Sequence, residues 1–119
     1  MKIINKILIA EDELLIAKVL RMQFEKLGFW VENVTDADET FNKVKQMKPD
    51  VIILDVHLKN KTSGIEAGRK IREAGIDTPI IFTTGYSYDN IMLLINDIGN
   101  SKVLSKPIEF EHLLKAINQ

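Results

Sequence analysis

The sequence predicts one α/β domain, an open parallel sheet of five strands with helices on both faces. Short apolar runs alternate five times with longer amphipathic segments, which is the pattern of repeated β-α units. Three of the runs, ILIA, VIIL and IIFT, are apolar throughout, as in strands of a parallel sheet that is covered above and below. Because crossovers between parallel strands are right-handed, we expect the helices on both faces, which makes the sheet doubly wound.

The strands are predicted where β-branched and other apolar residues run together. The five runs are Ile7 to Ala10, Trp30 to Val34, Val51 to Leu54, Ile80 to Thr83, and Lys102 to Leu104. The Trp30 run alternates between apolar and polar residues, and the Lys102 run is only weakly apolar. Because a marginal strand has less of its surface covered, we expect these two runs to form the edges of the sheet.

The helices are predicted from apolar residues that recur at helical spacing. The five stripes are Ile16, Leu20, Phe24 and Leu27; Ala37, Phe41 and Val44; Ile65, Gly68 and Ile71; Ile91, Leu94, Ile95 and Ile98; and Phe110, Leu113, Leu114 and Ile117. Thr35 and Asp36 are candidate N-caps of the second helix. Gly28, Gly75 and Gly99 mark the ends of three helices.

Length and composition bound the class of protein. The 119 residues correspond to a single domain spanning 1–119, and 45% hydrophobic with 28% charged residues is typical of globular domains. The net charge of −1 gives no reason to expect nucleic-acid binding by this domain. The absence of cysteine excludes disulfides, thiolate catalysis and cysteine-based zinc sites. No stretch approaches the roughly 20 apolar residues of a membrane span, so we expect a cytoplasmic protein without a membrane partner.

Polar and charged residues follow four of the five predicted strands. Glu11 and Asp12 follow the first strand, Asp55 the third, Thr84 the fourth and Lys106 the fifth. In doubly wound sheets the functional groups lie outside the carboxyl ends of the strands, so we expect these side chains at one edge. Three carboxylates that meet there would repel one another, and either raised pKa values or a bound cation would resolve the repulsion.

Magnesium fits this set of residues, because Mg²⁺ prefers oxygen ligands and typically takes one or two carboxylates together with phosphate oxygens. Lys106 offers a charge for a phosphate oxygen, and the Thr84 hydroxyl offers a further hydrogen bond. Together the groups indicate a phosphoryl-transfer site in which Asp55 is the covalent acceptor. The alternative interpretation makes Asp55 a helix cap, and Glu11 and Asp12 N-cap acids of the first helix.

The chain resembles the receiver domains of bacterial response regulators over nearly its whole length, from about Lys6 to about Asn118. The motifs that carry the resemblance are ILIAED, IILDVHL, PIIFTTG and VLSKP, in this order. The resemblance implies a flavodoxin-like fold with strand order 2-1-3-4-5. It also implies a phosphoacceptor switch of a two-component phosphorelay, with a histidine kinase or a histidine phosphotransfer protein as the donor.

The resemblance assigns an expected role to each acidic residue. Asp55 is the expected phosphoacceptor. Asp12 is expected to bind Mg²⁺ directly and Glu11 largely through water, and Asp55 and the backbone carbonyl of His57 are expected to be further ligands. His57 and Tyr86, two positions beyond the acceptor and two beyond the switch threonine, are expected to tune the lifetime of the phosphoryl group.

On the phosphoryl side, the resemblance implies that Thr84 grips the group and that Lys106 pairs with it, with a cis bond between Lys106 and Pro107. Two residues depart from the family's pattern. Lys59 stands where a proline is common, and Val103 stands where receivers often carry an aromatic switch residue. Coupling from Thr84 to the output face must therefore differ from the rotamer switch of a tyrosine or phenylalanine.

Two other function classes fit the residues less well. A hydrolase of the haloacid-dehalogenase type would carry a second acid where this chain has His57. A nucleotide- or flavin-binding domain would need glycines in the first turn, which reads AEDE here. We therefore expect a signalling switch and not a metabolic enzyme, with its own phosphorylation and slow dephosphorylation as its only reactions.

The fourth helical segment is apolar almost all round, at Ile91, Met92, Leu93, Leu94 and Ile95. Two interpretations are open at this point, namely local core packing or a surface for a partner, since exposed apolar patches usually mark contacts. On the second interpretation, the chain forms a homodimer through the face between its fourth and fifth helices.

Overall fold

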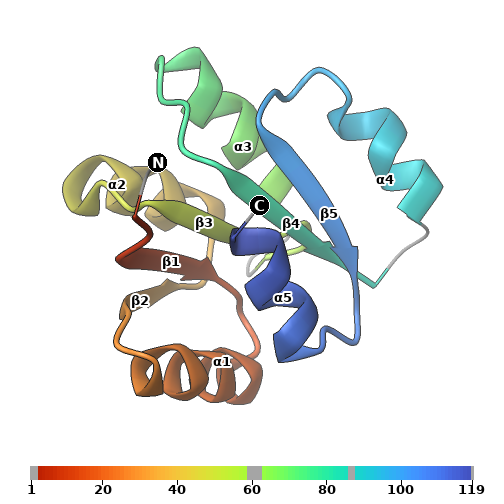
Figure 1. Ribbon diagram of the computed structural model, residues 1–119. Coiled ribbons are helices and arrows are strands. Elements are labelled where there is room, and N and C mark those ends of the chain that lie inside the picture. Colours follow the sequence, from red (N-terminus) through yellow and green to blue (C-terminus); the bar gives the residue numbers. More distant parts are fainter. Residues whose placement is uncertain (1–2, 59–62, 86–87, 119) are drawn as a thin grey trace.

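The fold is a five-stranded parallel sheet in the order β2-β1-β3-β4-β5 (Figure 1). The computed structural model describes residues 3–58, 63–85 and 88–118. The strands are β1 (Lys6–Ala10), β2 (Trp30–Val34), β3 (Val51–Asp55), β4 (Ile80–Thr84) and β5 (Ser101–Ser105). The helices are α1 (Leu14–Lys26), α2 (Ala37–Met47), α3 (Gly64–Glu73), α4 (Tyr88–Ile95) and α5 (Phe110–Ile117). The predicted class, strand order and edge strands are confirmed.

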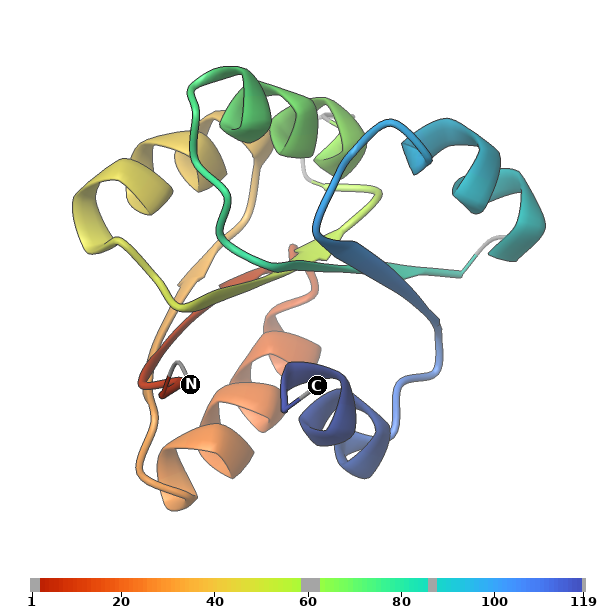
Figure 2. The same cartoon turned by 45° about the horizontal axis from the view of Figure 1, so that its top comes forward.

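The helices form a layer on each face of the sheet. Helices α1 and α5 cover one face, and α2, α3 and α4 cover the other (Figure 2). The alternation of side chains along each strand explains the two layers of core, because successive residues point to opposite faces. In β1, Ile7 and Ile9 belong to the core under α1 and α5, whereas Leu8 and Ala10 belong to the core under the other three helices.

Two predicted helix faces are partly wrong. In α1, Ile16 and Leu27 are 37% and 56% exposed, while Ala17 and Phe24 are buried. Ala17 thus takes the core position, and Ile16 lines the cavity between α1 and α5. In α4, Leu94 is 51% exposed because only the narrow side that carries Ile91 and Ile95 meets the core.

Local signals place most helix ends correctly. Asp36 is the N-cap of α2, and its carboxylate accepts a hydrogen bond from the amide of Glu39 at 2.8 Å. Gly28 and Gly75 follow α1 and α3 with φ values of 94° and 81°, which favour glycine. After α4 the left-handed residue is Asn100, with a φ of 53°, and not the predicted Gly99. Asparagine tolerates this conformation better than other side chains with a Cβ.

The helices are short. The longest one in the described part of the chain, α1, has 13 residues, whereas a membrane-spanning helix needs about 20 predominantly apolar residues. Among the residues that the structure describes, no helix has the length and apolar character that crossing a membrane would require.

Candidate phosphorylation site

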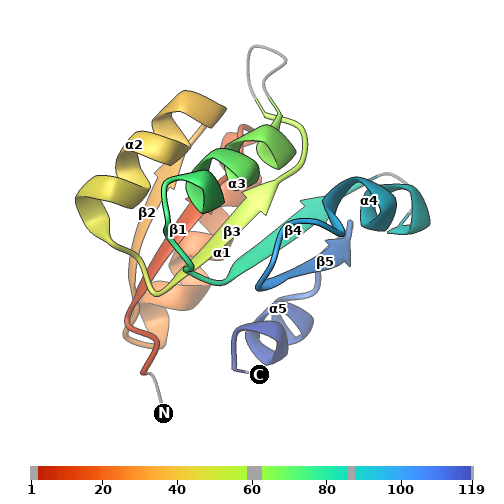
Figure 3. The same cartoon turned by 90° about the horizontal axis from the view of Figure 1, so that it is seen from above.

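Three carboxylates meet at the carboxyl edge of the sheet. Glu11 and Asp12 follow β1, and Asp55 is the last residue of the adjacent strand β3. One carboxylate oxygen from each residue lies within 4.8 Å of the others. Figure 3 shows β3, β4 and β5 running toward the same edge, which is why residues that are distant in the sequence converge there.

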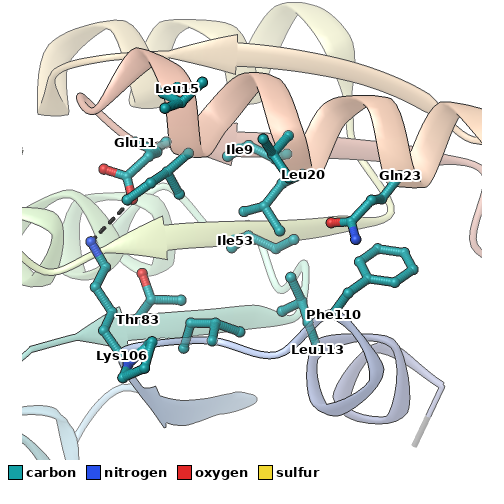
Figure 4. Close-up of a pocket in the computed structure, with 15 residues that line it drawn as sticks. Ile9, Glu11, Leu15, Leu20, Gln23, Ile53, Thr83, Lys106, Phe110 and Leu113 are labelled. Atoms are coloured by element: carbon teal, nitrogen blue, oxygen red, sulfur yellow. Dashed lines mark hydrogen bonds and ion pairs between the residues drawn. The ribbon is translucent and has the colours of Figure 1, made fainter.

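Lys106, which directly follows the edge strand β5, completes the cluster. Its ammonium lies 2.6 Å from Oδ2 of Asp55 and 3.0 Å from Oε1 of Glu11; Figure 4 shows the second contact. The backbone amide of Lys106 donates to the carbonyl of Thr84 at 2.7 Å, so β4 fixes the start of the lysine side chain. The bond between Lys106 and Pro107 is cis, as predicted.

The backbone around Asp55 holds its carboxylate in place. The amide of His57 donates to Oδ1 of Asp55 at 3.0 Å, and the lysine occupies Oδ2. The amide of Gly64 donates to the carbonyl of Val56 at 2.8 Å, which closes the segment after the acceptor against the start of α3. A Cβ atom on Gly64 would lie 2.0 Å from the backbone oxygen of Asp55. Glycine is therefore required where α3 approaches the acceptor.

The charges of the cluster are unbalanced. Burial raises the pKa of Glu11 to about 7, helped by the charge of Asp55 and opposed by the hydrogen bonds from Glu13 and Lys106. Burial alone would lower the pKa of Lys106, but the hydrogen bonds that it donates to Asp55 and Glu11 outweigh this effect and raise the pKa. Burial and the neighbouring charge of Asp55 thus keep Glu11 partly protonated near neutral pH, although Lys106 donates to it.

The donor set suits Mg²⁺. The three side chains offer only carboxylate oxygens, two of the three residues are almost fully buried, and Lys106 leaves part of their charge uncompensated. A small divalent cation that binds oxygen and keeps several waters matches this chemistry. His57 lies at the same edge, and its backbone amide is directed at Asp55.

Two threonines end β4, the predicted Thr84 and the preceding Thr83. Thr84 ends β4 and is fully buried, while Thr83 pairs in register with Asp55. The Thr83 side chain lines a cavity of about 700 Å³ between α1 and α5, which Glu11 and Lys106 also line (Figure 4). Because adjacent strand residues point to opposite faces, Thr84 points toward the layer of α3 and α4.

The sequence analysis singled out three further positions, Lys59, Tyr86 and Val103. Lys59 and Tyr86 lie outside the described residues. Val103 is buried in β5, paired in register with Phe82 of β4. The position that could hold an aromatic switch residue therefore belongs to the core in this chain.

Comparison with known proteins decides the family. The family model described as "Response regulator receiver domain" matches residues 7–118. The chain belongs to the response regulator receiver domain family. A receiver domain of this family is the phosphoacceptor part of a two-component system, and it is generally not a metabolic enzyme.

The relatives of this receiver domain include transcriptional regulators. It is 34% identical over 114 residues to the transcriptional regulatory protein DltR of Streptococcus agalactiae, covering 94% of this chain and 50% of that protein. It is 32% identical over 103 residues to the alkaline phosphatase synthesis transcriptional regulatory protein PhoP of Bacillus subtilis, covering 87% and 42% of the two chains. The chain thus spans about half the length of the curated relatives it matches.

Solved structures of receiver domains resemble this one closely. The chemotaxis protein CheY4 of Vibrio cholerae superimposes with a TM-score of 0.87 at 26% identity, over 98% of both chains. A response regulator of Burkholderia pseudomallei, solved with a phosphorylated aspartic acid, a calcium ion and citrate, gives a TM-score of 0.86 at 26% identity. The match covers 95% of this chain and 66% of that one.

Proposed function

We propose that Asp55 accepts a phosphoryl group from a phosphohistidine of a histidine kinase or a histidine phosphotransfer protein, in a reaction that depends on Mg²⁺. One observation carries the proposal. The Asp55 carboxylate is in contact with Lys106 and lies within 4.8 Å of two further carboxylates, at the end of a buried strand. A carboxylate nucleophile beside a lysine and a cation site is an arrangement suited to phosphoryl transfer.

The residues have distinct roles in the proposed reaction. A carboxylate oxygen of Asp55 attacks phosphorus, the bond from phosphorus to the donor's imidazole nitrogen breaks, and that nitrogen keeps the electron pair. Glu11, Asp12, Asp55 and the carbonyl of His57 would hold Mg²⁺, which when bound neutralises charge on the phosphoryl oxygens. Lys106 leaves its contacts with Asp55 and Glu11 and pairs with one of the phosphoryl oxygens. Hydrolysis of the acyl phosphate later restores the carboxylate.

Thr84 is proposed to recognise the product state. Its hydroxyl donates to a phosphoryl oxygen once Asp55 is modified, which biases β4 and the segment after it toward a second conformation. This donor, like Lys106, stabilises charge that is absent before transfer. The output is then a change in the surface that follows β4 and precedes β5.

The donor protein is proposed to pack against α1, beside the acceptor. Three apolar side chains of this helix, Leu15, Val19 and Met22, are 74%, 47% and 59% exposed. Leu15 and Val19 also line the cavity that reaches Lys106. Exposed apolar residues grouped next to a reactive group are typical of a contact surface. A cytoplasmic location is part of this proposal, since the donor has to meet the site by diffusion.

A homodimer through the face between α4 and α5 is proposed as the consequence of phosphorylation. Ile91 and Ile95 are buried, but Met92, Leu93 and Leu94 are 38%, 74% and 51% exposed. Helix α4 thus supplies both core packing and an exposed apolar patch. Replacing Leu93 by glutamate should abolish any dimer that forms on phosphorylation, as measured by analytical ultracentrifugation, and an unchanged dimer would contradict the choice of face.

The site assignment is tested by phosphorylation with a small acyl phosphate, with Mg²⁺ or with a chelator, scored by intact mass. The native chain should gain one phosphoryl group only with Mg²⁺, and Asp55→Asn should gain none. Asp38→Asn, which changes an acid in the first turn of α2, is the matched control and should behave as native. Equal modification of Asp55→Asn and the native chain would defeat the assignment.

A further inference from the structure

Two arginines of α3 bind the segment that connects α4 to β5. Arg72 donates from Nε to the carbonyl of Gly99 at 2.9 Å and from Nη2 to the carbonyl of Asn100 at 3.0 Å. Its Nη1 donates to the carbonyl of Ile76, just beyond its own helix, at 2.9 Å. One planar guanidinium therefore satisfies three backbone carbonyls and joins the end of α3 to the start of β5.

Arg69, one turn earlier, binds the end of α4 itself. Its Nη2 donates to the carbonyl of Leu94 at 2.5 Å. The same guanidinium contacts the Asp97 carboxylate at 3.4 Å, and this hydrogen bond lowers the pKa of Asp97. The last carbonyls of a helix have no partner within the helix. Arg69 supplies one from a neighbouring helix, so α3 caps the carboxyl end of α4.

Close packing of α3 brings both arginines within reach. Gly68 lies on the side of α3 that faces the core, and a Cβ atom there would be 2.8 Å from the ring of Phe82 and 3.7 Å from Ile98. Asn100 adds a further bond, from its side-chain amide to the carbonyl of Asp77 at 2.8 Å. The segment from Leu94 to Asn100 is thus attached to α3 and to the loop after it by side-chain bonds to backbone atoms.

Helix α3 also begins at the acceptor. Gly64, its first residue, lies against the Asp55 backbone, so closely that an added Cβ would be 2.0 Å from the Asp55 carbonyl oxygen. The same helix therefore touches the proposed phosphorylation site at its amino end and holds α4 at its carboxyl end. Val103 is not aromatic and cannot act as an aromatic switch. Helix α3 offers this chain a different physical connection, from the acceptor Asp55 to the segment between α4 and β5.

We propose that Arg69 and Arg72 form a regulatory clamp, which keeps the carboxyl end of α4 and the start of β5 fixed to α3 when Asp55 is phosphorylated. Phosphorylation then moves α4 at its amino end, which follows Thr84, while the clamped end acts as the pivot. The proposal rests on the proposed function for its regulatory part. The clamp itself is a property of the unmodified protein.

Amide hydrogen exchange tests the clamp on the full chain. The variant is the double substitution Arg69→Lys with Arg72→Lys, because lysine keeps the charge but lacks the planar fork that binds several carbonyls. Arg21→Lys is the matched control, since Arg21 makes an exposed pair with Glu25 on α1. In the unmodified protein, amides of residues 96–101 should exchange about tenfold faster in the double variant, while those of β3 and the control stay native.

The regulatory part is tested by adding beryllofluoride with Mg²⁺ as a phosphoryl mimic. In the native chain, exchange should change in residues 88–93 and remain unchanged in residues 96–101. In the double variant it should change in both segments. Native exchange of residues 96–101 in the unmodified variant would overturn the clamp, and identical responses of the two proteins to the mimic would overturn its regulatory role. If the native chain takes no phosphoryl group, the proposed function fails, while the comparison without the mimic still decides whether the clamp exists.

Discussion

Replacing Glu11 by glutamine should favour the metal-free domain more at alkaline pH than at acidic pH. Glu11 is 4% exposed and shares Lys106 with Asp55. Glutamine keeps the shape and carries no charge, but it has a single acceptor oxygen. It can therefore keep only one of two hydrogen bonds, the one from Lys106 to Oε1 or the one from the amide of Glu13 to Oε2. The lost hydrogen bond lowers stability equally at every pH, whereas the removed cost of ionising a buried carboxylate depends on pH.

The magnitude follows from the pKa. Burial raises the pKa of Glu11 from 4.5 to about 7. At about 1.4 kcal/mol for each pH unit, this difference corresponds to roughly 3 kcal/mol. Because the pKa of Glu11 is higher in the folded state, its contribution to the free energy of unfolding is fully present below about pH 4.5. That contribution is lost as the pH rises through about 7. The glutamine variant loses nothing over this range, so the two proteins diverge with rising pH.

Urea unfolding with a chelator present, at about pH 5 and at about pH 8, measures this divergence. The stability difference in favour of Glu11→Gln should widen by roughly 2 to 3 kcal/mol between the two conditions. Glu13→Gln, an exposed carboxylate two residues along, serves as the control. The proposed Mg²⁺ site needs ionised carboxylates, so at pH 8 added Mg²⁺ should stabilise the native chain more than the variant. A stability difference that stays constant with pH would refute the electrostatic reasoning.

Two further predictions concern residues around the acceptor. Gly64→Ala should cost about 3 kcal/mol or more in urea unfolding, since its Cβ would lie 2.0 Å from the Asp55 carbonyl oxygen. Gly85→Ala should cost far less, because nothing lies within 4 Å of its added Cβ; equal costs for the two would contradict the close approach. Thr84→Val should slow phosphorylation by a small acyl phosphate about tenfold or more. Thr83→Val should leave the rate within about twofold, and the reverse order would assign the functional hydroxyl to Thr83.

The sheet and the site could be predicted because both follow from the order of residues along single strands. An apolar run such as VIIL has no polar face, so it belongs between two layers, and the residue that ends it lies at the functional edge of the sheet. Asp55, Glu11 and Lys106 were identified on this basis, and the structure places them in contact. Neither their partners nor their distances had to be known.

Rotations and long-range contacts could not be predicted in the same way. Stripes through Ile16 and through Ala17 share the next residues of α1, and only packing against the sheet chooses between them. Apart from the contact of Arg69 with Asp97, the hydrogen bonds that the two arginines donate end on backbone carbonyls. Every residue has such a carbonyl, so the sequence carries no signal of which ones accept. The sequence could not show that Thr83, and not Thr84, lines the cavity beside Glu11 and Lys106, because that depends on which face of the sheet each threonine meets.

The charge imbalance at the sheet edge links stability to the proposed function. Lys106 contacts both Glu11 and Asp55, but burial together with the charge of Asp55 still raises the pKa of Glu11 to about 7. A second lysine could neutralise the cluster, but it would take the space and the charge that the proposed cation and phosphoryl group need. Ionising Glu11 therefore costs the folded metal-free domain free energy at alkaline pH. In the proposed function, bound Mg²⁺ offsets this cost. This is why the site should tighten its hold on Mg²⁺ as Glu11 loses its proton.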